Sequence, residues 1–79
     1  MLPDDVCSQY ANSGIKLSVC EIDGTVLVEG KREALLFLAA LVTAQADAHD
    51  DGFAIGPKGA GRAFFSKTST KGLYIHRID

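Results

Sequence analysis

Residues 15–42 constrain the fold of this chain more than any other part of the sequence, because they follow the pattern strand, tight turn, strand and helix. Apolar and polar residues alternate from Ile15 towards Ile22, which is the two-residue period of a half-buried strand. Asp23-Gly24 favours a two-residue type I′ turn, in which both central residues have positive φ. A second strand then returns through Val26-Leu27-Val28, and this continuous apolar run predicts burial on both faces.

A helix is expected from about Lys31, after Gly30, with fraying from Asp47 and a stop at Gly52. At 100° per residue, one apolar arc should cover the sheet. This arc holds Ala34, Leu35, Leu38, Leu41 and Val42, with Phe37 at its margin. The opposite face carries Arg32 but is otherwise uncharged, and it predicts a homodimer interface, because closed twofold pairing is the commonest soluble assembly. That interface would contain Leu36, Ala39, Ala40 and Thr43.

The remaining sequence predicts a flexible lead-in and a few short strands. Residues 1–14 show little periodicity and are interpreted as the lead-in, which leaves residues 15–79 as a single domain. Phe53–Ile55 and Leu73–Ile78 are expected strands, and Arg62–Ser66 is a further candidate strand. The predicted class is α+β with the order β-β-α-β-(β)-β. One helix would pack on one face of an antiparallel-rich sheet of four to five strands, as a two-layer sandwich.

The composition predicts a cytoplasmic globular protein. The longest apolar run, residues 34–42, is about half of the roughly 20 residues that cross a bilayer. The N-terminus has neither the basic region nor the apolar region of a secretory signal. Cys7 and Cys20 lack the spacing of a metal site, and whether they pair is left open.

No pattern in the sequence predicts catalysis, and we expect a protein without catalytic residues, metal or cofactor. His49 and His76 could act as general bases, but no motif supplies a nucleophile. Asp47, His49, Asp50 and Asp51 could form a weak metal site, but their spacing favours a solvated helix exit. The glycine-rich stretch 56–62 fails the phosphate-loop pattern and is interpreted as a turn.

Charge is distributed unevenly along the chain. Residues 1–51 carry three basic and nine acidic residues, whereas residues 52–79 carry five basic residues and one acidic residue. The second half therefore predicts a partner-binding surface for an acidic protein, in which charge would speed encounter. That surface would contain Lys58, Arg62, Lys67, Lys71, Tyr74 and Arg77. The same residues could bind nucleic acid, but the pI of about 5.5 argues against it, since dedicated domains lie above about 9.

Two stretches carry a resemblance to a known family. Residues 26–42, VLVEGKREALLFLAALV, and residues 72–78, GLYIHRI, resemble small immunity proteins of bacterial polymorphic-toxin systems, in particular the immunity protein family numbered thirty-two. The resemblance implies a non-enzymatic protein that binds and occludes a cognate toxin, and it implies no catalytic residues. The alternatives are a nucleic-acid-binding module and a structural homo-oligomer.

Overall fold

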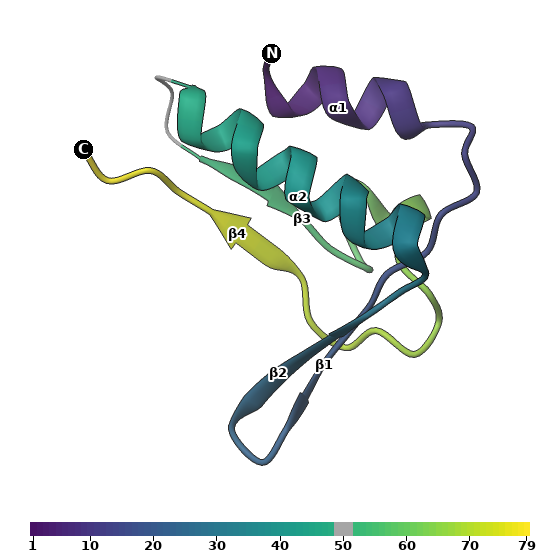
Figure 1. The fold of residues 1–79 in the computed structure, drawn as a ribbon. Helices are drawn as coiled ribbons and strands as arrows, with labels where there is room; N and C mark the ends of the chain where they lie inside the picture. Colours follow the sequence, from purple (N-terminus) through teal and green to yellow (C-terminus); the bar gives the residue numbers. More distant parts are fainter. Residues whose placement is uncertain (49–51) are drawn as a thin grey trace.

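The predicted strand–turn–strand–helix unit is present in the structure, a computed structural model that describes residues 1–48 and 52–79 (Figure 1). Within these residues the chain is a small α+β protein with two helices and four short strands. The elements are α1 (Pro3–Tyr10), β1 (Ser18–Ile22), β2 (Thr25–Glu29), α2 (Arg32–Asp47), β3 (Phe53–Ile55), the single 3₁₀ turn η1 (Arg62–Phe64) and β4 (Leu73–Ile75).

The β1–β2 hairpin has the predicted turn. β1 pairs antiparallel with β2, so that Ile22 faces Thr25 across the turn. Asp23 has φ 50° and Gly24 has φ 80°, which confirms the prediction of positive φ at both positions. The predicted burial of residues 26–28 on both faces is wrong, since Val26 is 58% exposed. The turn end of the hairpin extends away from the helices (Figure 1), whereas Val19 belongs to the core and Val28 packs against it.

Gly24→Val should destabilise the protein by about 1–3 kcal/mol, because a β-branched residue is strained at positive φ. Thr25→Val is the matched control, since it places the same side chain at the neighbouring exposed position without changing the turn. Urea unfolding of both variants tests the turn. Equal midpoints for the two would contradict this assignment.

The strands form two separate two-stranded sheets, so the predicted single sheet of four to five strands is wrong. β3 pairs antiparallel with β4 in the second sheet. The segment between these strands lies along the free side of β1: Leu17 bridges Phe65, and the amides of Thr70 and Lys71 donate to the carbonyl of Val19. Because this segment hydrogen-bonds to the free edge of β1, neither β3 nor β4 pairs with that edge.

The candidate strand Arg62–Ser66 is also wrong, because Arg62–Phe64 forms the turn η1. The polar residues 66–71 after η1 do more than connect two elements of secondary structure. The Ser69 hydroxyl donates to the Leu17 carbonyl at 3.0 Å and accepts from the Val19 amide at 3.1 Å. Side-chain oxygens of this run therefore satisfy backbone groups of β1 that a neighbouring strand would otherwise satisfy.

α2 buries a different face from the predicted one. Ala34 and Leu41 are buried as expected, but Phe37 is fully buried rather than marginal. Leu35 is 44% exposed and Val42 is 46% exposed, so their assignment to the core is wrong. The helix ends at Asp47 rather than at Gly52. The core forms where α2 meets α1, β1 and the residues around η1, and it includes Val6, Leu17, Val19, Phe37, Leu41, Ile55 and Phe65.

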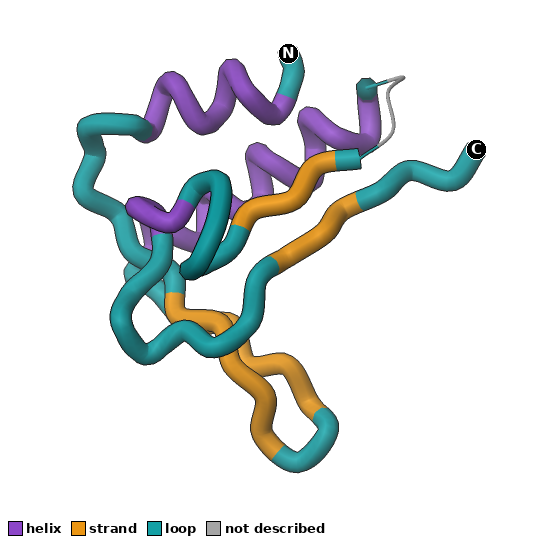
Figure 2. Tube along the Cα trace, turned by 180° about the vertical axis from the view of Figure 1, so that it is seen from behind, coloured by secondary structure: helices purple, strands orange, loops and turns teal. Residues whose placement is uncertain are grey.

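The N-terminal segment contains a helix that the interpretation as a lead-in missed. α1 begins with Pro3, and the Leu2 amide donates to the Asp5 carboxylate at 2.8 Å, which satisfies one free donor at the helix start. Val6 is 1% exposed, and Tyr10 packs beside it against the core. α1 lies across α2 (Figures 1 and 2). None of the described helices is long and apolar enough to span a membrane.

Candidate interaction surface

The described part of the chain brings together no group of three His, Cys, Asp or Glu side chains that could hold a metal ion. His49, Asp50 and Asp51, which were weighed as ligands with Asp47, lie outside the described residues. Burial, followed by the nearby charge of Asp4, raises the pKa of the Cys7 thiol above its usual value. A thiol with a raised pKa is a poor nucleophile at neutral pH. Cys20 is likewise a free cysteine.

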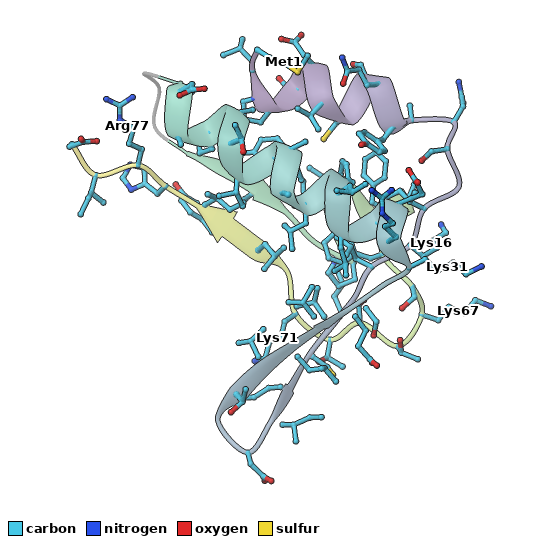
Figure 3. The ribbon with its side chains drawn as sticks, viewed as in Figure 1. Met1, Lys16, Lys31, Lys67, Lys71 and Arg77 are labelled. Atoms are coloured by element: carbon cyan, nitrogen blue, oxygen red, sulfur yellow. The ribbon has the colours of Figure 1, made fainter. Side chains whose placement is uncertain are left out.

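The predicted basic surface is divided between two sides of the molecule. Lys67 and Arg77 lie at opposite ends, and Lys16 and Lys31 lie on the same side as Lys67 (Figure 3). Lys71 lies between these ends and forms an exposed ion pair with Glu21 at 3.9 Å. Lys58, Arg62 and Tyr74 are exposed. Because Lys67 and Arg77 are far apart, these six residues do not make one continuous contact surface.

Arg77 attaches the C-terminal segment to α2. One of its guanidinium nitrogens donates to the carbonyls of Ala46 and Ala48, at 3.1 and 3.2 Å, and its Nε donates to the Asp79 carboxylate at 2.7 Å. A cation at a helix C-terminus is favourable, since the last carbonyls lack intrahelical partners. The hydrogen bond from Arg77, together with its charge, lowers the pKa of the Asp79 carboxyl. Arg77 is thus engaged within the chain.

The exposed side of α2 is the most unusual surface of this protein. No charged residue lies between Glu33 and Asp47 in the helix. At 100° per residue, the exposed residues of this stretch fall in a sector of about 120°. We call them the α2 outer face: Leu35, Leu36, Ala39, Val42, Thr43 and Ala46. A helix that is apolar all round is normally buried, yet this one meets solvent on a whole side.

The structure separates the predicted oligomer face into two parts. Leu36, Ala39 and Thr43 are exposed as expected, and Leu36 has an exposed fraction of 41%. Ala40 is half-buried and packs against the core, so it does not belong to the exposed side.

The α2 outer face adjoins a depression at the C-terminal end of the helix. Val42 and Ile75 line this depression together with polar residues of the C-terminal segment, and its volume is about 610 Å³. The exposed apolar side chains of α2 therefore continue towards β4. His76 and Asp47 supply polar groups at this end of the α2 outer face.

The sequence predicts two of the six residues of the α2 outer face, Leu35 and Val42, to lie in the core. Projection at 100° per residue places Leu35 and Val42 in one arc with Ala34, Leu38 and Leu41. Ala44, Gln45 and Ala48 are buried, so the buried side of the helix faces away from Leu35. Where a helix lacks charged residues over several turns, the periodicity of its apolar residues does not show which side faces solvent.

This chain matches no protein-family model, and comparison with curated proteins and with solved structures gives no significant match.

Proposed function

We propose that this protein is a small non-catalytic binding protein that occludes a protein partner, in the manner of an immunity protein, and that the α2 outer face is its contact surface. One observation carries the proposal: a fully formed helix whose solvent side is apolar and uncharged from Leu35 to Ala46. Contiguous exposed apolar patches on small proteins mark interaction sites.

The size and shape of these side chains suit a protein partner. Leu35, Leu36 and Val42 could each contribute about 1.5–3 kcal/mol if fully buried by a partner. Ala39 is small and lies between these anchors, and Ala46 is small and follows them, so a helix of the partner could approach closely. Arg32 and Asp47 lie at the two ends of the face and would form its polar rim. The partner's complementary surface should therefore be apolar and lack buried charge.

Ala39→Glu should abolish protection by this protein. The test is to co-express it with the product of the neighbouring reading frame, which in an immunity system is the toxin, and to measure growth and the Kd of the purified pair. A carboxylate in the middle of an apolar interface is left without a partner, so affinity should fall on the order of 100-fold or more. The exposed site tolerates Glu in a helix, so circular dichroism should remain native.

Lys58→Glu is the matched control, because it adds the same side chain to an exposed position of the basic half. This control should protect as well as the wild type. Loss of protection by Lys58→Glu but not by Ala39→Glu would move the contact surface to the basic residues and overturn the assignment to α2. A neighbouring product that is harmless, or one that the wild type does not bind, would overturn the immunity role itself.

A further inference from the structure

The outer edge of β2 is an open strand edge. On the other side of the hairpin, the Val19 carbonyl accepts from Thr70 and Lys71, and its amide donates to Ser69. Val19 faces Val28 in the pairing, and it directs its backbone groups away from β2. Because the hydrogen-bonding direction alternates along a strand, Val26 and Val28 direct their own amides and carbonyls to the outer side of β2. No other described residue forms a backbone hydrogen bond there.

β2 has one charged residue, Glu29 at its end, and no charged residue or proline in its middle that would protect this edge. Natural proteins block exposed edges with lysine, proline, bulges or a covering element. β2 has the sequence Thr-Val-Leu-Val-Glu, and all five of its residues pair with β1 in continuous register, without a bulge. The turn end of the hairpin projects from the body of the molecule (Figures 1 and 2), and Val26 is 58% exposed, so this part of the edge is accessible. An accessible apolar edge of this kind is suited to pairing with another strand.

We infer that a second copy of this chain pairs with β2 along this edge, in antiparallel orientation, so that two hairpins form one four-stranded sheet. The strand is complementary to itself about Leu27. With Leu27 facing Leu27 of the second copy, Val26 faces Val28, and Thr25 faces Glu29. The outward backbone groups of Val26 and Val28 then meet, and each of these pairs exchanges two hydrogen bonds.

Charges outside the strand fit the same register. Asp23 in the turn and Lys31 at the start of α2 are equally distant from Leu27 in the sequence. Antiparallel pairing therefore brings the acidic turn of one copy towards Lys31 of the other, and this happens twice by symmetry. Within the strand, Glu29 is the only charged residue, and it faces a threonine. In this register no two residues of like charge face each other, and such pairs would destabilise the sheet.

Analytical ultracentrifugation tests the pairing. The wild type should sediment at twice its mass of 8.4 kDa. Val26→Pro removes an outward amide without touching a bond to β1, so it should yield a monomer. Val26→Thr keeps the amide and the branched shape and should remain a dimer. Val26→Lys, which protects an edge while keeping every amide, should also give a monomer, and it covers the case in which proline prevents folding.

A cysteine cross-link tests the register. In a Cys7→Ala, Cys20→Ala background, Leu27→Cys would place two thiols on the symmetry axis. Leu27 and its symmetry mate form a pair without mutual hydrogen bonds, with Cα atoms about 4.5 Å apart, which suits a disulfide. Mild oxidation should therefore give a covalent dimer. Thr25→Cys lies on the same face of the strand but opposite Glu29, so it should not cross-link.

Three results would each overturn the pairing: a wild type that sediments as a monomer at high concentration, a Val26→Pro variant that stays dimeric, or cross-linking of Thr25→Cys as readily as Leu27→Cys. The dimer and the proposed function rest on different surfaces. Ala39→Glu should leave the dimer intact, and Val26→Pro should leave the α2 outer face intact. A dimer that dissociates with Ala39→Glu but not with Val26→Pro would place self-association on α2 and contradict the inference.

Discussion

Phe37→Ala should leave this protein largely unfolded. The Phe37 ring is fully buried, and its centre lies 5.1 Å from that of Tyr10 and 4.5 Å from that of Phe64. It therefore joins α1, α2 and η1 at the point where these three segments meet in the core. Removing a buried phenylalanine ring costs about 3–5 kcal/mol. A domain of this length has about 4–12 kcal/mol in all, so the loss takes much or all of its stability.

Leu36→Ala is the matched control for this prediction, because Leu36 directly precedes Phe37 in the same helix but is 41% exposed. Its effect should stay within about 0.5 kcal/mol, as for most surface substitutions. Urea unfolding followed by circular dichroism measures both. If the two variants unfold at the same denaturant concentration, the buried side of α2 has been assigned to the wrong residues.

The local elements could be predicted from the sequence because short-range rules determine them. Asp23-Gly24 defines its turn by backbone conformation alone, and the alternation before it defines β1. The strand at Phe53–Ile55 was also predicted correctly. In each case the deciding residues are neighbours in the chain, so no tertiary partner was needed to interpret them.

The arrangement of the sheets could not be predicted, because it depends on which segment reaches the free edge of β1. A polar run with serine and threonine side chains takes that place through Ser69 and the amides of residues 70 and 71. Sequence patterns identify such a run as a loop and do not show that it completes a strand edge. α1 was missed for a related reason: it is short, and its buried contact rests largely on Val6.

Only about half of the α2 outer face could be predicted from the sequence. The uncharged character of α2 is evident from the sequence, and it drew attention to Leu36, Ala39 and Thr43. Which apolar residues join them depends on how far the helix is rotated, and α1 together with the core around Phe37 determines that rotation. The role of Arg77 was equally hidden, since its hydrogen bonds reach carbonyls about thirty residues away in the chain.

Gly72→Ala should separate β4 from β3. A Cβ atom at this position would lie 2.7 Å from the carbonyl oxygen of Ile55 and 3.0 Å from the Cα of Gly56. Both contacts are with backbone, which cannot turn aside as a flexible side chain can. The second sheet consists of only three residue pairs, so it has little capacity to absorb the displacement. Overpacking of this kind costs about 1–3 kcal/mol.

The loss should spread beyond the two strands, because β4 leads directly into the segment that Arg77 attaches to the end of α2. Amide exchange measured by NMR should therefore accelerate in β3, in β4 and at the C-terminal end of α2, while it stays slow in the β1–β2 hairpin. Gly59→Ala is the matched control, since a Cβ atom at Gly59 meets nothing within 4 Å. It should be neutral or stabilising by up to about 1 kcal/mol, through the lower entropy of the unfolded chain. If both alanine variants show wild-type stability and exchange, the close approach of Gly72 to the end of β3 does not hold this sheet together, and the attachment through Arg77 must suffice alone.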